Sequence, residues 1–198
     1  MNTMRAPGHR AGLTHGAVVA TARELLLESG LDGLTMRALA RRLDVAPNAL
    51  YSHVANKTEL LDEVLDELLA AVAAPELRTG DPSTELAKLL SSTYEMLTCS
   101  PQLVGLYLTR QGAQGPHAVR LGEAMDALLT ESGVRSVADA RRALIIHTIG
   151  SAAFATSAPA DPPGRRMSEV EARHLFERSL RWLLAGITQD LGDRRASG

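Results

Sequence analysis

The fold of this chain is decided by residues 34–64, which read LTMRALARRLDVAPNALYSHVANKTELLDEV. Two short helices are predicted there, over residues 36–43 and 47–53, with only a few residues between them. Thr35 is a suitable N-cap for the first helix, and Pro47 suits the first turn of the second, where a backbone N–H has no helical partner to lose. Helices joined this closely must cross at a steep angle, and Ala40 leaves room for the second to approach the first. The expected geometry is a helix-turn-helix.

The second of these helices is predicted to project from the surface with side chains that suit a DNA groove. Those side chains are short, polar or aromatic, and none is acidic. They belong to Pro47, Asn48, Ala49, Tyr51, Ser52 and His53. Lys57 opens a further predicted helix, whose first amides can also hold a phosphate. A plain helical hairpin is the alternative, and Asn48 could contact a phosphate instead of reading an adenine.

The rest of the chain also follows a helical pattern. Apolar residues recur at helical spacing through most of the 198 residues, and no sustained alternation of apolar and polar residues indicates a strand. The predicted fold class is therefore all-α. Further helices are expected over residues 15–29, 57–73, 83–98, 102–109, 117–132, 136–157 and 168–191. Gly30 should end the first of these in a left-handed conformation, and Asn56 with Glu59 has the spacing of a capping box.

Composition excludes several classes of protein. The single cysteine, Cys99, allows no internal disulfide framework and no multi-cysteine metal site. The longest plain apolar run, residues 68–74, has seven residues, too few to span a bilayer, so no membrane partner is expected. No secretory signal is evident, and the cytoplasm is the expected compartment. No phosphate-binding glycine loop, metal-ligand pair or nucleophile elbow is present, which argues against an enzyme, a metal site or a cofactor.

Charge is distributed unevenly along the chain. Residues 1–60 hold 7 Lys and Arg against 5 Asp and Glu, a net of +2, whereas residues 61–198 hold 14 against 18, a net of −4. Four of the N-terminal basic residues, Arg37, Arg41, Arg42 and Lys57, fall close together. The N-terminal third is therefore the end expected to face a polyanion.

The N-terminal third of the chain is similar to a known family. Residues 18–65 resemble the DNA-binding domain of TetR-family transcriptional regulators, and the segments GLDGLTMRALARRLDV and ALYSHVANKTELLD are especially similar to those of tetracycline-repressor-type members. The resemblance implies an N-terminal three-helix DNA-binding domain, residues 14–60, and a helical ligand-binding and dimerisation domain, residues 61–198. Residues 1–13 are expected to form a flexible arm, and a Pro-rich loop is expected over residues 158–167.

The resemblance also implies roles for individual residues. Thr35 and Arg37 match positions that contact the DNA backbone and a base edge. Pro47, Asn48 and Ala49 match the positions that read bases. Phosphate clamps are expected at Tyr51 and Lys57, and His53 matches the histidine of the same motif. Two residues depart from the pattern: Ser52 stands where related repressors often have a bulky aromatic, and Ala46 lacks the frequent capping side chain.

A helix-turn-helix of this size reads few base pairs, so affinity normally comes from a two-fold dimer that reads two half-sites. The last two predicted helices are apolar around much of their circumference, which predicts a four-helix bundle with a second copy; a fully internal helix in a monomer is the alternative. The resemblance further implies a small-molecule pocket among the middle helices. Its candidate residues, each also explained as ordinary core, are Tyr94, Met96, Leu103, Tyr107, Met125, Leu128, His147 and Phe154.

The expected function is a ligand-responsive regulator that binds double-stranded DNA. In its most specific form this is a repressor that binds a palindromic operator as a homodimer and is released by a small apolar effector. Tetracycline itself is not indicated, because the His and Glu groups of that repressor's chelated-metal site have no counterpart here. A helical small-molecule-binding or interaction module that has lost DNA binding is the alternative.

Overall fold

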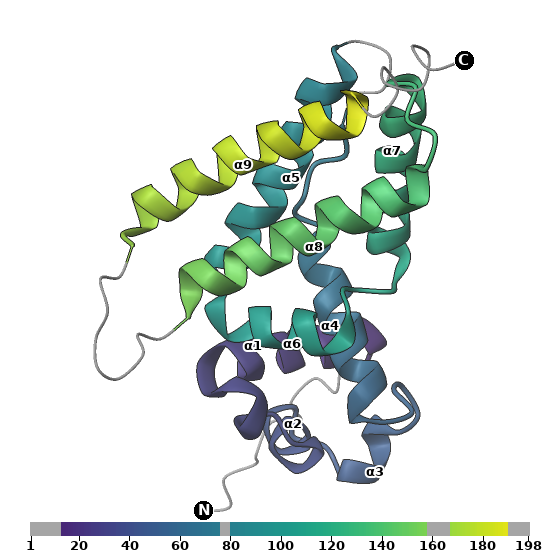
Figure 1. Ribbon diagram of the computed structural model, residues 1–198. Coiled ribbons are helices and arrows are strands. Elements are labelled where there is room, and N and C mark those ends of the chain that lie inside the picture. The colour runs from purple at the N-terminus through teal and green to yellow at the C-terminus, as the bar shows by residue number, and fades with distance from the viewer. Residues whose placement is uncertain (1–12, 76–79, 158–166, 190–198) are drawn as a thin grey trace, which may run out of the picture. The chain divides into compact units, whose positions relative to one another are not determined.

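A computed structural model describes residues 13–75, 80–157 and 167–189, and within these ranges the chain is entirely helical (Figure 1). The helices are α1 (His15–Gly33), α2 (Met36–Arg42), α3 (Pro47–Leu50), α4 (Lys57–Leu69), α5 (Pro82–Thr98), α6 (Pro101–Arg110), α7 (Pro116–Glu131), α8 (Val137–Thr156) and α9 (Glu169–Gln189). This confirms the predicted all-α class. The expected arm falls outside the described residues except for Leu13, as does the Pro-rich loop except for Met167.

The chain divides into two compact units, one ending at Val64 and the other beginning at Leu65. The boundary lies inside α4, so the first two thirds of that helix belong to the first unit and its end to the second. In the described residues no helix is both long and apolar enough to cross a membrane.

Side-chain caps fix the helices of the first unit. Thr14 Oγ1 accepts a hydrogen bond from the N–H of Ala17 at 3.2 Å, and Thr35 Oγ1 accepts one from the N–H of Ala38 at 3.0 Å. Gly30 has the positive φ that the prediction required, 68°, but its ψ of −173° is not that of a left-handed helical residue, and it kinks α1, which continues to Gly33, rather than ending it. The most buried side chains of this unit include Val18, Leu26, Leu34, Leu39 and Leu50.

Asn56 and Glu59 cap the start of α4, with the return bond one residue earlier than in a standard capping box. The N–H of Glu59 donates to Asn56 Oδ1 at 2.9 Å, and Glu59 Oε2 accepts in return from the N–H of Ala55 at 2.6 Å. The helix ends at Leu69 rather than near Ala73, because the backbone tightens there into bonds between residues three apart, such as that from Val72 to the carbonyl of Leu69.

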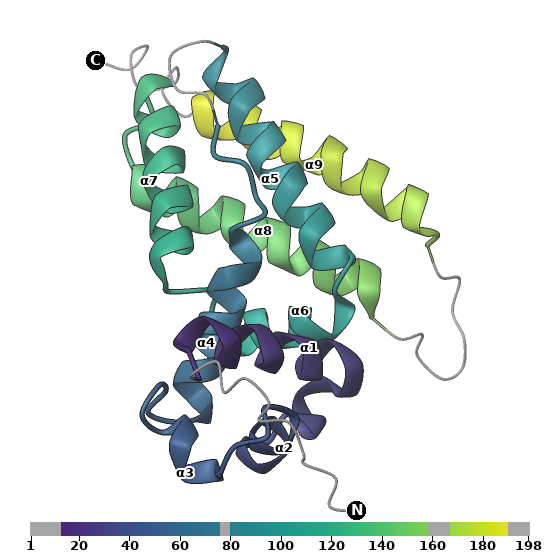
Figure 2. The same cartoon turned by 180° about the vertical axis from the view of Figure 1, so that it is seen from behind.

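The second unit is built around α8, which packs against α5, α6, α7 and α9 (Figures 1 and 2). Its core contains large apolar side chains with almost no exposure, among them Leu86, Leu97, Leu103, Leu128, Leu144 and Phe176. Other apolar side chains of α8 and α9 remain exposed: Ile146 by 65%, Phe154 by 70% and Trp182 by 64%. These two helices therefore carry an apolar face that the described residues of the unit do not cover.

Candidate nucleic-acid interface and ligand pocket

The short helix α3 presents the predicted reading residues. Leu50 is fully buried and anchors the helix, whereas Pro47 and Asn48 are exposed and Ala49 is half-buried. Ala46 makes no side-chain cap, as its methyl group dictates. The outward placement therefore comes from one buried leucine and a proline at the first helical position.

The helix is shorter than predicted, and its last three residues form a turn instead. Ser52 Oγ donates to the carbonyl of Ala49 at 2.7 Å, which competes with a further helical turn. Tyr51 follows directly after the helix with 53% of its surface exposed, and His53 is half-buried. The predicted exposed set is thus divided between a one-turn helix and the turn that follows.

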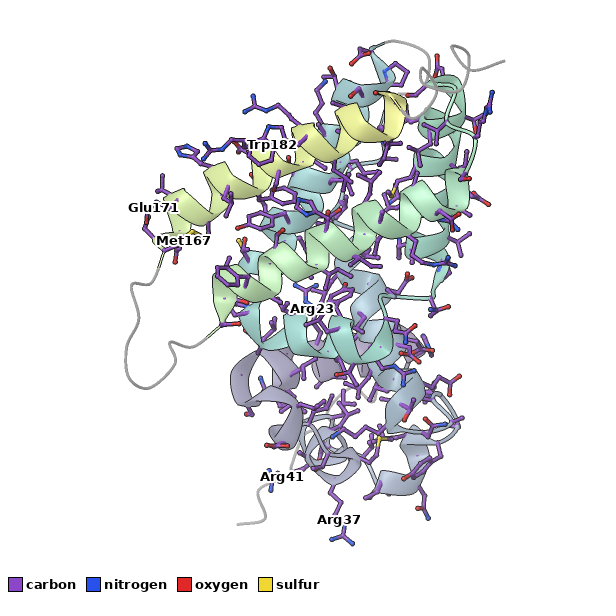
Figure 3. All side chains as sticks on the ribbon, viewed as in Figure 1. Arg23, Arg37, Arg41, Met167, Glu171 and Trp182 are labelled. Carbon is purple, nitrogen blue, oxygen red and sulfur yellow. The ribbon has the colours of Figure 1, made fainter. Side chains whose placement is uncertain are left out.

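The arginines of α2 differ in how they are paired. Arg42 donates to both carboxylate oxygens of Glu28, at 2.6 and 2.7 Å, and lies 3.7 Å from Glu24. The hydrogen bonding between Arg42 and Glu28 lowers the pKa of Glu28 and raises the pKa of Arg42. Arg37 and Arg41 are exposed and extend away from the ribbon, and among the described residues neither has an ionic partner (Figure 3). Arg37 and Arg41 can therefore contact a phosphate, whereas Arg42 is already paired with a carboxylate.

Lys57, at the start of α4, is partly engaged within the first unit. Its Nζ donates to the carbonyl of Leu31 at 3.1 Å, near the end of α1. An ammonium group has three N–H donors, so two remain for a phosphate. The bond to Leu31 fixes the direction of the side chain, and no pattern in the sequence indicates it.

A pocket of about 140 Å³ lies inside the second unit. Of the predicted pocket residues, Met96, Tyr107 and Met125 line it. The hydroxyls of two lining residues, Thr93 and Thr148, donate to carbonyls of their own helices at 2.9 Å. The pocket is therefore mostly apolar and its hydroxyl groups are already satisfied. Lining residues that the sequence did not suggest include Leu69, Thr93, Ile145 and Thr148, which are not distinguishable from core positions by spacing.

An open groove of about 790 Å³ adjoins this pocket, because the two share lining residues such as Tyr107, Ala118 and Gly122. The groove is formed by α6, α7 and α8 and contains charged side chains. Among them Arg141 donates to Asp126 at 2.6 Å. The groove beside the apolar pocket is therefore lined by both charged and apolar side chains, the latter including Ile145 and Ile146.

The remaining predicted pocket residues lie elsewhere. Leu103 and Leu128 are core residues and Tyr94 is 3% exposed, and none of the three lines the two pockets just described. Tyr94 stacks on Phe176 with ring centroids 4.2 Å apart, and His147 stacks on the same phenyl ring at 5.6 Å. His147 and Phe154 line a separate groove of about 450 Å³ between α8 and α9. Burial lowers the pKa of His147, whose Nε2 lies 3.1 Å from Ser179 Oγ.

Comparison with known proteins places this geometry among DNA-binding regulators. Residues 18–64 match the family model described as bacterial regulatory proteins, tetR family. An HTH-type transcriptional regulator of Saccharopolyspora erythraea is 30% identical over 187 residues, which cover 93% of this chain and 79% of the relative.

Two solved structures share the fold. The Streptomyces coelicolor TetR family protein ActR, in complex with actinorhodin, superposes with a TM-score of 0.78 at 28% identity, over 92% of this chain and all of ActR. BioQ with its natural double-stranded DNA operator superposes with a TM-score of 0.68 at 25% identity, over 89% of this chain and 99% of BioQ.

Proposed function

The chain belongs to the tetR family of bacterial regulatory proteins, which are DNA-binding transcriptional regulators and not enzymes, and from this premise we propose that it is a repressor released from its operator by a small apolar effector. The operator is a palindrome that two copies of the chain bind together. The observation that carries the proposal is the one-turn helix α3, held by a buried Leu50 and carrying an exposed Asn48 beside an exposed Tyr51.

The proposed DNA contacts are of two kinds, those that read a base and those that hold a phosphate. Asn48 is the side chain suited to a bidentate contact with adenine, worth about 1–3 kcal/mol of discrimination. The Tyr51 hydroxyl and the two remaining Lys57 donors suit phosphate oxygens, which set affinity but not sequence. Thr35 caps α2 and thereby fixes the position of Arg37. Pro47, Ala49, Ser52 and His53 complete the proposed surface.

Dimer formation is supported by the uncovered apolar face of α8 and α9. Ile146, Phe154 and Trp182 are each more than half exposed, which is unusual for three large side chains in one area of a monomer. A second copy that covers them with its own α8 and α9 gives two reading helices related by a two-fold axis, and an operator with matching symmetry.

Effector binding is supported by the apolar pocket of the second unit. Leu69, the last residue of α4, lines that pocket, while Lys57 at the other end of α4 is a proposed phosphate contact. A ligand that binds better to one position of α4 than to another changes operator affinity by that difference. ActR is a relative crystallised with a small molecule, actinorhodin.

DNA binding is tested by fluorescence anisotropy with duplexes from upstream of the gene for this chain, at several salt concentrations. Asn48→Ala and Tyr51→Phe should each weaken binding, whereas Gln102→Ala, an exposed change on α6, should leave it unchanged. Unaltered affinity in both interface variants would remove the proposed reading surface. A chain that binds small molecules but no DNA would instead be the helical binding module that stands as the alternative.

Effector binding is tested with compounds selected because they raise the melting temperature of the protein. Gly122 lines both the pocket and the groove, so Gly122→Leu should narrow the passage between them and abolish release of the operator by such compounds. Gly105→Leu is the matched control, because Gly105 is also a helical glycine, is exposed, and leaves open space within 4 Å of the position that a Cβ would take. Equal responses in both variants would place the effector elsewhere.

A further inference from the structure

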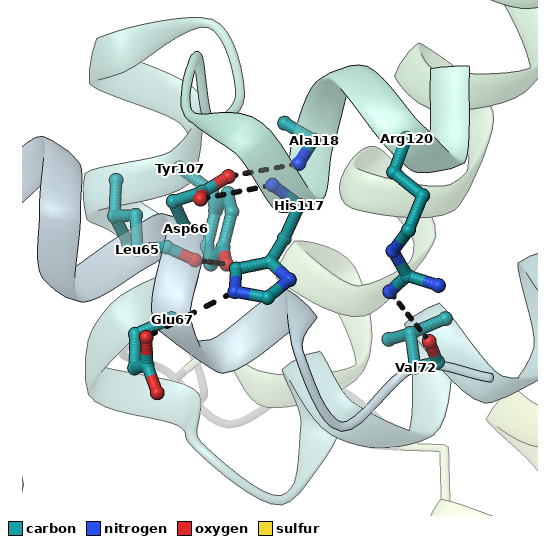
Figure 4. A network of polar contacts seen from close by, with 8 residues as sticks. All are labelled: Leu65, Asp66, Glu67, Val72, Tyr107, His117, Ala118 and Arg120. Atoms are coloured by element: carbon teal, nitrogen blue, oxygen red, sulfur yellow. Dashed lines mark hydrogen bonds and ion pairs between the residues drawn. The ribbon is translucent and has the colours of Figure 1, made fainter. Parts of the chain in front are cut away.

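The carboxylate of Asp66 caps a helix to which it does not belong. Asp66 lies near the end of α4 and is 4% exposed. Its Oδ2 accepts a hydrogen bond from the N–H of His117 at 3.0 Å, and its Oδ1 accepts one from the N–H of Ala118 at 2.8 Å (Figure 4). These two residues follow Pro116 in the first turn of α7, whose own N-cap residue, Gly115, has no side chain that could accept these bonds.

With Asp66 in place, every backbone donor in the first turn of α7 is satisfied. Pro116 has no N–H, and the N–H of Val119 donates to the carbonyl of Gly115 at 3.0 Å. The other two donors are those that Asp66 accepts. A buried carboxylate is costly unless hydrogen bonds compensate for the lost water, and the positive end of a helix dipole is a favourable position for it. Asp66 and the start of α7 therefore depend on each other.

Gly115 leaves the space that the carboxylate of Asp66 occupies. A Cβ at position 115 would overlap the carboxyl carbon of Asp66. The backbone of Gly115, with φ of −85° and ψ of −172°, is ordinary extended backbone that any residue adopts. The glycine is thus required by space and not by conformation. We call Asp66, Gly115 and the amides of His117 and Ala118 the α4–α7 clasp.

The clasp lies beside the apolar pocket. Ala118, one of its members, lines the pocket together with Leu69 of α4. Tyr107 of α6 also lines it and donates its hydroxyl to the carbonyl of Leu65 (Figure 4). Pockets that bury drug-sized ligands have volumes of about 300–1,000 Å³, so a volume of about 140 Å³ admits such a ligand only if its walls move apart.

We propose that Asp66 is a positioning residue that holds the end of α4 to α7, and that an occupant of the pocket acts on α4 by separating Leu69 from Ala118 and opening the clasp. The closed clasp is the arrangement that binds DNA. This inference rests on the proposed function, because the clasp transmits a signal only if the other end of α4 contacts an operator. The coupling is reciprocal. The factor by which closing the clasp raises operator affinity equals the factor by which a bound operator shifts the clasp toward its closed form.

The test exchanges the two partners in the double variant Asp66→Gly with Gly115→Asp. The carboxylate then caps α7 from the N-cap position of α7 itself, so the cap is kept while its link to α4 is removed. Glu67→Gly is the matched control, because it places a glycine in the same turn of α4 at an exposed position and keeps both hydrogen bonds of Asp66. It also removes the ion pair of 4.0 Å between Glu67 and the His117 imidazole, so it separates the effect of that pair from the effect of Asp66. Hydrogen exchange of the peptide that contains residues 115–121 is measured by mass spectrometry in the full-length protein. Each protein is measured alone and with an operator duplex selected by the wild-type chain from a random library.

In the wild type and in Glu67→Gly, the operator should slow exchange of the His117 and Ala118 amides by about fivefold or more, the lower end of typical coupling between sites. In the exchanged variant these amides should be protected but unaffected by the operator. If the exchanged variant does not fold, Asp66→Asn replaces it. The operator-dependent slowing should then fall, because the amide nitrogen that replaces one carboxylate oxygen is a donor and cannot accept the bond that this oxygen accepted.

Two outcomes overturn the inference alone. One is operator binding by the wild type with no change in exchange at this peptide, and the other is equal slowing in the wild type and in the exchanged variant. A purely structural cap predicts the second outcome, because stability returns with the carboxylate wherever it is attached. A wild-type chain that selects no duplex from the library overturns the proposed function and this inference together.

Discussion

Arg37 and Arg42 of α2 should respond differently to the same substitution. Arg37 is exposed without an ionic partner among the described residues, whereas Arg42 is held by both oxygens of Glu28. We expect Arg37→Gln to remove a phosphate contact. Arg42→Gln should instead remove an ion pair within the first unit and leave the number of phosphate contacts unchanged.

The size of the effect follows from counterion release. The logarithm of the binding constant falls with the logarithm of salt concentration, with a slope of about −0.9 for each phosphate neutralised. A dimer carries two copies of Arg37, so Arg37→Gln should make the slope shallower by about 1.8. Arg42→Gln should leave the slope unchanged and lower the melting temperature, because Glu24 and Glu28 then repel each other without a cation between them.

The assay is fluorescence anisotropy of a labelled operator from about 50 to 200 mM salt, with thermal unfolding measured on the same preparations. The reasoning is refuted if Arg42→Gln lowers the slope as much as Arg37→Gln does, because pairing with Glu28 would then not withhold Arg42 from DNA. It is also refuted if Arg37→Gln weakens binding with an unchanged slope, since its role would then be something other than phosphate contact.

Three further predictions concern stability and assembly. Gly30→Ala should destabilise the protein by about 1–2 kcal/mol in denaturant unfolding, because an L-residue is strained at a φ of 68°, whereas Gly16→Ala, in helical backbone with open space, should not destabilise it. Trp182→Arg should give a monomer in light scattering that retains its helical circular dichroism but binds the operator poorly, because it places a charge on the apolar face of α9. His147 has a folded-state pKa below its ordinary value of 6.5, so its contribution to stability is complete above pH 6.5 and is lost as the pH falls below it. Melting temperatures of His147→Gln should therefore decline less than those of the wild type below that pH, and parallel curves would contradict the assignment.

Local signals in the sequence were sufficient for most of the fold. The caps at Thr14, Thr35 and Asn56 act between residues three or four apart, so their geometry follows from spacing alone. The end of α3 was predicted wrongly because Ser52 and the residues around it are compatible with both a helix and a turn. Whether the helix continues depends on the Ser52 hydroxyl, which donates to the Ala49 carbonyl that a further helical turn would use.

The outward placement of Pro47, Asn48 and Tyr51 followed from the local pattern, whereas contacts between distant helices did not. Arg42 and Glu28 are separated by 14 positions and belong to different helices, so the sequence could not show that one arginine of the basic cluster is neutralised. Asp66 and Gly115 are 49 positions apart. In the sequence, Asp66 reads as an ordinary helix residue and Gly115 as an ordinary loop residue, so nothing connects them. The adjacent Gly115 and Pro116 mark a helix start without a cap of its own, which is the signal that points to a cap from elsewhere.

Net charge does not explain why this chain should bind a polyanion. The positive balance of residues 1–60 disappears when the division is made at the structural boundary, because residues 1–64 hold 7 Lys and Arg against 7 Asp and Glu. Salt screens exposed charges beyond about 8 Å under physiological conditions, so the whole-chain charge of −2 has little effect at contact distance. What matters is pairing: Glu24 and Glu28 neutralise Arg42, and Glu63 lies 3.0 Å from His15, while Arg37 and Arg41 are left for phosphate. Association should therefore be slower than in strongly basic regulators, with the affinity for DNA expressed in slow dissociation from short-range contacts.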